Sequence, residues 1–167
     1  MIKPHTIALP ILVLFLTACI KNRDDKLMKA RMKARADAIK ISKKRSAAFH
    51  VKKKSESGVI TLSSGLQYKV LRSGKGESPS ATDRVTCHYE GRHLNGLVFD
   101  SSYKRGRATE LGVNRVIPGW TEALKRMKIG DKWELYIPYQ LAYGERGTRR
   151  IPPCSSLIFI IELINYR

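Results

Sequence analysis

Residues 119–130 read GWTEALKRMKIG, and residues 119–127 within them carry the clearest helical pattern beyond residue 57. The apolar residues of this stretch fall at the spacing of one helix face, and they are Trp120, Ala123, Leu124 and Met127. Gly130 follows, and glycine commonly ends a helix. The pattern therefore predicts one short helix whose buried face carries a tryptophan.

Strand patterns lie on both sides of this helix in the sequence. Residues 84–90 alternate between apolar and polar, and the dipeptide Asn95-Gly96 is a strong hairpin signal that joins them to residues 97–99. The apolar face of the alternating run consists of Val85, Cys87 and Tyr89. Further strand-like runs occupy residues 59–62, 66–71, 133–137 and 157–164. We expect an α+β domain over residues 57–167, with a curved antiparallel sheet wrapped around one short helix.

Motifs for a metal site, a phosphate loop or a nucleophilic catalyst do not occur in the sequence, so we expect no metal and no cofactor. The three cysteines are too few for a disulfide framework, and they are Cys19, Cys87 and Cys154. Cys87 shares the face of Tyr89 and is expected to be a small buried apolar residue. Cys154 is either a reactive thiol or an inert loop residue, and the second interpretation is favoured. Periodicity alone leads no further than a small α+β domain.

A set of short motifs that follow one another in a fixed order is more specific. The motifs are His88-Tyr89-Glu90-Gly91, Phe99-Asp100-Ser101-Ser102, Val116-Ile117-Pro118-Gly119-Trp120, Ala142-Tyr143-Gly144 and Ile151-Pro152-Pro153. Together they resemble the FKBP-type peptidyl-prolyl isomerases, and in particular the macrophage infectivity potentiator class of bacterial surface lipoproteins. The resemblance covers residues 63–165. Each motif alone is weak, but their order is highly specific.

The resemblance implies a proline-binding pocket and assigns residues to it. It implies catalytic roles for Tyr89, Phe99, Asp100, Trp120 and Tyr143. It implies substrate-binding roles for Val116, Ile117, Ile151 and Phe159. In this mapping Trp120 is the floor beneath the proline ring, and the Ile117 N–H anchors a substrate carbonyl. Read without the ordered motifs, the tryptophan, the phenylalanines and the valine would be ordinary core residues.

The same resemblance implies isomerisation of X–Pro bonds in proline-containing polypeptides, with macrolides of the rapamycin and tacrolimus type as inhibitors. Two other functions stay open: a surface adhesin or binding module with this fold, and a polyanion-binding lipoprotein. Host interaction is a further role that this class of lipoprotein implies. The sequence departs from the family at Ala108, where relatives carry proline, which predicts a looser edge after Gly106. The loop after Gly144 carries Arg146, Arg149 and Arg150, which favours acidic residues beside the substrate proline.

The first nineteen residues read MIKPHTIALPILVLFLTAC and are typical of an export signal. The apolar run at residues 7–16 would span about 15 Å as a helix, which is half the thickness of a bilayer's hydrocarbon core. Leu16-Thr17-Ala18-Cys19 resembles a lipobox, which implies a signal peptide at residues 1–18 and a lipid (palmitate-type) anchor on Cys19. A plain cleaved signal is the alternative. Ile20 follows the cysteine in place of an acidic residue, so the resemblance favours the outer membrane of the cell envelope.

Residues 19–56 form a basic connector between the expected anchor and the expected domain. The whole chain has a formal charge of +18, and residues 20–56 hold 14 basic against 4 acidic residues. Residues 24–49 lack glycine and proline, which indicates a helix, with a disordered connector as the alternative, and residues 52–58 are expected to form a hinge. A solvated spacer is favoured over a helix lying on anionic lipid or a weak dimerisation helix. The connector has no interleaved aromatic residues, so no specific nucleic acid partner is expected.

Overall fold

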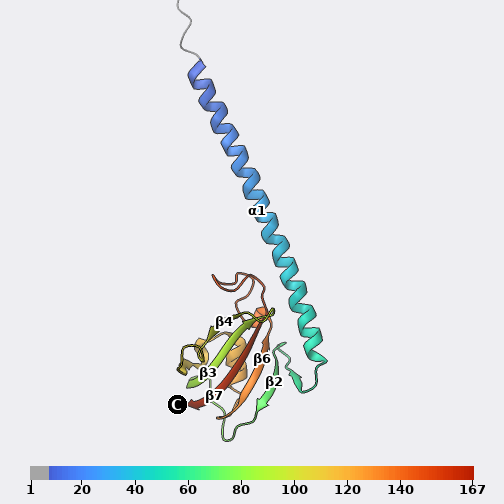
Figure 1. Cartoon of the computed structure of the whole chain (residues 1–167), viewed down its shortest axis with the longest axis vertical. Helices are drawn as coiled ribbons and strands as arrows, with labels where there is room; N and C mark the ends of the chain where they lie inside the picture. Colours follow the sequence, from blue (N-terminus) through green and yellow to red (C-terminus); the bar gives the residue numbers. More distant parts are fainter. Residues whose placement is uncertain (1–7) are drawn as a thin grey trace, which may run out of the picture. The chain divides into compact units, whose positions relative to one another are not determined.

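The computed structural model describes residues 8–167, with side chains from residue 21 onward. The chain divides into two compact units, Met1–Lys40 and Ile41–Arg167, and Figure 1 shows it coloured along the sequence. Helix α1 (Ala8–Lys54) belongs to both units, so the helix expected over residues 24–49 is present and longer than predicted. The second unit begins before residue 57, where the globular domain was expected to start, because the end of α1 packs on the sheet.

The part of the first unit whose side chains are described, residues 21–40, is a basic and largely exposed stretch of α1. Among its side chains from residue 21 onward, even the large apolar ones Leu27, Met28 and Met32 are 49%, 62% and 67% exposed. Within the described residues, no helix combines the length and apolar character needed to cross a membrane. The backbone of Cys19 lies in α1, but its side chain and residues 1–7 of the expected signal peptide lie outside what the structure describes.

The second unit is built on one sheet in which every neighbouring pair of strands is antiparallel. Its strands are β1 (Val59–Thr61), β2 (Gln67–Arg72), β3 (Arg84–His93), β4 (Val98–Ser101), β5 (Thr109–Gly112), β6 (Lys132–Ile137) and β7 (Leu157–Tyr166). They follow the order β1-β2-β6-β7-β3-β4. The first half of β3 pairs with β5 and its second half with β4, so these two short strands share one edge of β3.

Two elements differ from the sequence-based expectation. The segment after Gly106, where an edge looser than in the family is expected, contains the short strand β5, which four residues were too few to reveal by alternation. It is held on β3 by pairing from Arg84↔Gly112 to Cys87↔Thr109 and by an ion pair between Arg84 and Glu110. Helix α2 covers Pro118–Leu124 rather than residues 119–127, because the chain leaves the helix in a turn at Lys125. The Met127 side chain is nevertheless fully buried, as its spacing predicted.

The core lies between α2 and one face of the sheet. The alternation predicted for β3 is confirmed, since Val85, Cys87 and Tyr89 are all buried. Burial raises the pKa of the Cys87 thiol to about 12, so it stays protonated and serves as a small apolar residue. Trp120, Ala123 and Leu124 of α2 are also buried in this core. α2 is therefore wedged against the sheet by the residues that its periodicity singled out.

The end of α1 packs against the sheet through a set of aromatic and polar contacts. Phe49 meets Tyr136 of β6 edge to face, with ring centroids 5.8 Å apart. The Lys53 ammonium lies 4.3 Å from the centroid of the Tyr136 ring and pairs with Glu56. Residues 52–54 end α1 as helix, and Lys53 makes these contacts, so the hinge expected at residues 52–58 is wrong at its first three positions. A cation over an aromatic face and an edge-to-face pair both stabilise such docking.

His50 is the polar centre of this contact. Its Nδ1 lies 2.8 Å from Oε1 of Gln67, which can only accept, so Nδ1 carries the proton. Its Nε2 lies 3.0 Å from the Ser156 hydroxyl and accepts from it. Burial lowers the pKa of the His50 imidazole, and the hydrogen bond with Gln67 offsets this only in part. The arrangement therefore holds a neutral histidine.

We predict that this neutral histidine makes stability depend on pH. The pKa of His50 is lower when folded than its unfolded value near 6.5, so the folded state binds fewer protons. The neutral His50 therefore contributes fully to the free energy of unfolding at pH values above the unfolded pKa. This contribution is lost as the pH falls from the unfolded pKa toward the lower folded pKa. Thermal unfolding between pH 8 and pH 5 should show the wild-type Tm falling more steeply than that of His50→Gln. Parallel curves for the two proteins would contradict this.

Candidate active site

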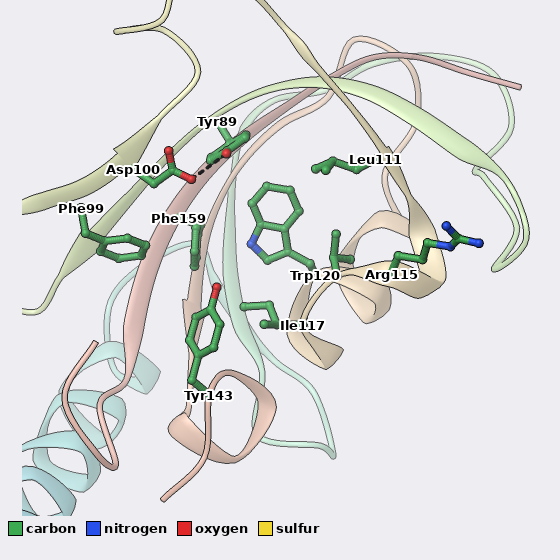
Figure 2. A pocket seen from close by; sticks show the side chains of 10 residues that line it. Tyr89, Phe99, Asp100, Leu111, Arg115, Ile117, Trp120, Tyr143 and Phe159 are labelled. Carbon is green, nitrogen blue, oxygen red and sulfur yellow. Dashed lines mark hydrogen bonds between the residues drawn. The ribbon is translucent and has the colours of Figure 1, made fainter. Parts of the chain in front are cut away.

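A cavity of about 370 Å³ opens beside α2, and Figure 2 shows the side chains around it. It is lined by Tyr89, Phe99, Asp100, Leu111, Arg115, Val116, Ile117, Trp120, Tyr143 and Phe159. Eight of the nine residues that the resemblance assigned to the site line this cavity. The exception is Ile151, which lines a smaller neighbouring cavity of about 290 Å³ together with Phe99, Asp100 and Tyr143.

The floor and walls of the cavity are aromatic rings in contact with one another. Trp120 is only 4% exposed. The centroid of its ring lies 5.1 Å from that of Tyr89, with an angle of 81° between the ring planes, and 5.2 Å from that of Phe159, with an angle of 89°. The ring centroids of Phe99 and Phe159 lie 5.6 Å apart, and their ring planes form an angle of 87°. These are edge-to-face arrangements, which aromatic pairs prefer. The rings therefore fix one another at near right angles around an apolar hollow (Figure 2).

Two glycines allow the elements that carry these rings to approach closely. Gly119 places α2 against β6, since a Cβ on it would lie 2.6 Å from Ile137 Cγ2. Gly91 of β3 lies opposite Phe159 of β7 in the sheet register. A Cβ on Gly91 would lie 2.6 Å from the Phe159 ring and 2.7 Å from the Phe99 ring. The spacing of the aromatic walls thus depends on the absence of a side chain at Gly91.

A polar cluster closes one side of the cavity. The Tyr89 hydroxyl donates to Asp100 Oδ2 at 2.7 Å and accepts from the Arg105 guanidinium at 2.9 Å, and Arg105 also pairs with Asp100. Partial burial acts to raise the pKa of the Asp100 carboxyl, but the hydrogen bonds from Tyr89 and Arg105 outweigh it and lower that pKa. Burial, reinforced by the bond to Asp100, raises the pKa of the Tyr89 phenol. Asp100 is therefore an ionised acceptor at neutral pH, and Tyr89 is a neutral phenol.

Two further polar groups have no partner among the described residues. The Tyr143 side chain is 38% exposed, and its hydroxyl points inward among the rings (Figure 2). Partial burial, with the nearby charge of Asp100, raises the pKa of this phenol, so it keeps its proton. The Ile117 N–H precedes the first turn of α2, and no acceptor for it occurs among the hydrogen bonds of residues 21–167. Both groups are free to donate to a bound molecule.

Three residues near the site were not found by sequence reasoning: Leu111, Arg105 and Arg115. Leu111 comes from β5 and Arg115 from the 3-10 helix η1 (Val113–Arg115), and the sequence shows neither element clearly. Arg105 reaches the site from the loop before β5 and lies 5.4 Å from the Tyr89 ring centroid. No local signal distinguishes this arginine from the other basic residues of the chain.

Other reactive side chains are used structurally. His88 stacks on Tyr103 with ring centroids 4.7 Å apart and bonds to the Ser102 hydroxyl. Cys154 is fully buried, and burial raises the pKa of its thiol, which agrees with the favoured interpretation of an inert loop residue. Within the part of the chain that the structure describes, no group of three His, Cys, Asp or Glu residues is arranged to hold a metal ion.

The comparisons with known proteins agree with this geometry. Residues 75–164, a little over half of the chain, match the family of FKBP-type peptidyl-prolyl cis-trans isomerases. Residues 16–70 match the domain found amino-terminal to FKBP-type peptidyl-prolyl isomerases. The chain therefore belongs to the FKBP-type peptidyl-prolyl cis-trans isomerase family.

Three relatives indicate its place in that family. It is 53% identical over 124 residues to the peptidyl-prolyl cis-trans isomerase Mip of Coxiella burnetii, covering 74% of this chain and 54% of the relative. It is 44% identical over 127 residues to the outer membrane protein MIP of Legionella longbeachae, and the match covers 75% of this chain and 54% of the relative. The crystal structure of FkpA from Escherichia coli superposes with a TM-score of 0.85 at 36% identity, covering 91% of this chain and 71% of that one. The chain thus spans about half the length of these two Mip relatives.

We predict that Gly91→Ala disturbs the cavity more than it disturbs the fold. The new methyl group would push on the rings of Phe99 and Phe159, which should cost about 1–3 kcal/mol of stability. Displaced rings should lower kcat/KM for isomerisation of a proline peptide by about tenfold or more. The control is Gly96→Ala, where no atom lies within 4 Å of the new Cβ but the positive φ strains the turn. An equal loss of activity in both variants would show that the cavity is not the cause.

Proposed function

We propose that this protein accelerates cis/trans isomerisation of X–Pro bonds in exported polypeptides. The observation that carries the proposal is the cavity whose floor is Trp120 and whose walls are perpendicular aromatic rings. Its volume of about 370 Å³ suits a proline and part of its neighbours. The family to which the chain belongs supports the same activity.

The chemistry explains why such a site is sufficient. Rotation about an X–Pro amide meets a barrier of about 20 kcal/mol because resonance keeps the amide planar. No covalent bond breaks, so neither a nucleophile nor a metal is required. Resonance makes the planar amide more polar than the twisted one, and a dry aromatic cavity therefore disfavours the planar form relative to the transition state. A barrier lower by about 5 kcal/mol corresponds to a few-thousandfold acceleration.

The described side chains suggest a role for each part of the site. The proline ring lies on the Trp120 floor between Tyr89 and Phe159, while Phe99 and Val116 close the apolar wall. The Ile117 N–H and the Tyr143 hydroxyl donate hydrogen bonds to substrate carbonyl groups. Asp100 acts as an acceptor and as a positioning group, since it fixes the Tyr89 hydroxyl and Arg105. Ile151 contacts the substrate beside the proline, in the neighbouring cavity.

We predict that loss of the aromatic floor separates activity from stability. Trp120→Leu in the full chain should lower kcat/KM for a proline peptide by about a hundredfold, because the proline ring loses the surface that positions it. The matched control is Trp133→Leu, since Trp133 is also buried but stacks on Tyr68 and does not line the cavity. Both variants should be less stable by a few kcal/mol. A coupled peptide assay below both Tm values would contradict the proposal if the two variants were equally active.

The same assay distinguishes an isomerase from a binding module with this fold. A binding module would leave proline peptides at their uncatalysed rate while still binding them. Tyr143→Phe refines the test, because it removes one partly exposed hydroxyl and should lower kcat/KM by about three- to tenfold, the value of one hydrogen bond. Macrolides of the rapamycin and tacrolimus type are expected to compete with the peptide for the cavity.

The location that we propose is the cell envelope, with a lipid anchor on Cys19. The lipobox-like residues 16–19 support it, and a relative carries the name outer membrane protein MIP. Removal of residues 1–18 would leave Cys19 as the first residue and the basic segment 20–56 beside the membrane. In the favoured interpretation this segment is a solvated spacer, and in the alternative, where it lies on anionic lipid, its basic residues would contribute about 1 kcal/mol each near the surface.

We predict that Cys19→Ala abolishes acylation and releases the protein from membranes. A single thiol carries the anchor, and Cys87 and Cys154 are both buried. Expression in a bacterial host with labelled palmitate, followed by membrane fractionation, measures both effects. Cys154→Ala serves as the control and should keep the label. Membrane retention and labelling of the Cys19→Ala protein would contradict the anchor.

A further inference from the structure

The cavity described above does not end at the proline site. The neighbouring cavity of about 290 Å³ shares Phe99, Asp100 and Tyr143 with it. Its remaining lining comes from one loop and consists of Thr148, Arg149, Arg150 and Ile151. A polypeptide whose proline lies on Trp120 continues on both sides of the proline. The second cavity is thus positioned to receive the residues beside the proline.

The second cavity is positively charged. Arg149 and Arg150 are exposed, and neither forms an ion pair with any described carboxylate. The one carboxylate that lines it, Asp100, is already paired with Arg105. Glu145, an acidic residue on the loop itself, is paired with Lys43. Two arginines in this cavity therefore have no negative partner.

The loop that carries these arginines is held in place by hydrogen bonds. The Thr148 N–H donates to the Ile151 carbonyl at 2.7 Å, and the Thr148 hydroxyl accepts from the N–H of Arg150 and of Ile151. The Cys154 N–H donates to the Gly144 carbonyl at 3.0 Å, and the Ile151 side chain is buried. A fixed loop presents its cations at less entropic cost than a free one.

A third cavity continues from the same loop within the unit Ile41–Arg167. It measures about 360 Å³ and shares Arg150 with the second cavity. Its lining also includes Arg45 of α1 and the hairpin residues His93 and Asn95. Arg45 forms no ion pair among the described residues either. The second cavity shares lining residues with each of the other two, so the three form a row, and each member is lined by an arginine without a carboxylate partner among the described residues: Arg115 in the first, Arg149 and Arg150 in the second, and Arg45 in the third.

We propose that this row is an extended substrate track that selects polypeptides with acidic residues near the proline, and the inference rests on the isomerase function proposed above. Arg149 and Arg150 pair with an acidic side chain next to or two residues from the proline. Arg45 pairs with acidic residues further along the same segment. Carboxylates suit these positions because an arginine guanidinium binds a carboxylate through two parallel hydrogen bonds. Arg146, on the same loop, lines none of these cavities.

The test compares kcat/KM for short peptides that carry Glu, Gln or Lys at each of the two positions on either side of X–Pro. The full-length protein should prefer the best Glu peptide over its Gln counterpart by about three- to tenfold at low salt, as one or two partly exposed ion pairs allow. The preference should shrink at 0.5 M salt, because exposed charges are screened. Arg149→Gln combined with Arg150→Gln should bring the ratio close to one.

The matched control removes the same charge elsewhere. Lys44→Gln combined with Arg146→Gln alters two exposed cations that line none of these three cavities, and it should keep the wild-type Glu/Gln ratio. An equal loss in both double variants would overturn the inference, because the preference would then come from the net charge of the protein. A Glu/Gln ratio of one in the wild type would overturn it as well. Turnover of the Gln peptide keeps the two proposals separate, since its absence would refute the isomerase function itself.

The third cavity is tested with longer peptides that carry Glu four to six residues from the proline. Arg45→Gln should reduce the preference for these peptides by about threefold, while the ratio for the short peptides stays at the wild-type value. An unchanged preference for the long peptides would show that the track ends at Arg150.

Discussion

The packing of Trp120 is the constraint on which the rest of the site depends. One ring has to be part of the hydrophobic core and also form the floor of an open cavity. It does both because Tyr89 and Phe159 meet it edge to face at centroid distances of 5.1 and 5.2 Å, which fixes its plane. The residues behind it on α2, Ala123 and Leu124, are fully buried and hold the helix on the sheet. The binding surface is therefore as rigid as the core that supports it.

The sheet contributes by leaving space where the rings need it. β3 changes partner along its length, from β5 to β4, and the register shifts at Gly91/Arg92. Gly91 falls at this point, opposite Phe159, so the two phenylalanine rings occupy the volume that a side chain would fill. Packing is what requires glycine at position 91, because its φ is not in the left-handed region, whereas a Cβ there would collide with the two rings.

The cavity is lined mainly by aromatic and apolar side chains, and charged side chains lie around it. Asp100 is the acidic residue that lines it, and Tyr89 and Arg105 satisfy its carboxylate beside the rings, whereas Arg115 of the lining has no carboxylate partner among the described residues. The neutral Tyr143 phenol and the Ile117 N–H supply donors without adding charge. Beyond Tyr143 the positive charge increases, because Arg149 and Arg150 also lack carboxylate partners among the described residues. Recognition of the proline and recognition of its neighbours thus rest on different physical terms, apolar contact in one case and charge in the other.

The sequence by itself determined the α+β class, the inward face of β3, the buried face of α2 and eight of the residues that line the cavity. It could do so because alternation and helical spacing report burial directly, and because the motifs appear in the order of a known family. Tertiary structure decided the rest. Leu111 reaches the cavity because β5 pairs with the edge of β3, and Arg115 reaches it from the 3-10 helix η1 that follows β5. Arg105 is distinguished from the other basic residues by its contact with Asp100. The end of α1 joins the domain through Phe49 and His50, since contacts between residues far apart in the chain leave no periodic trace in it.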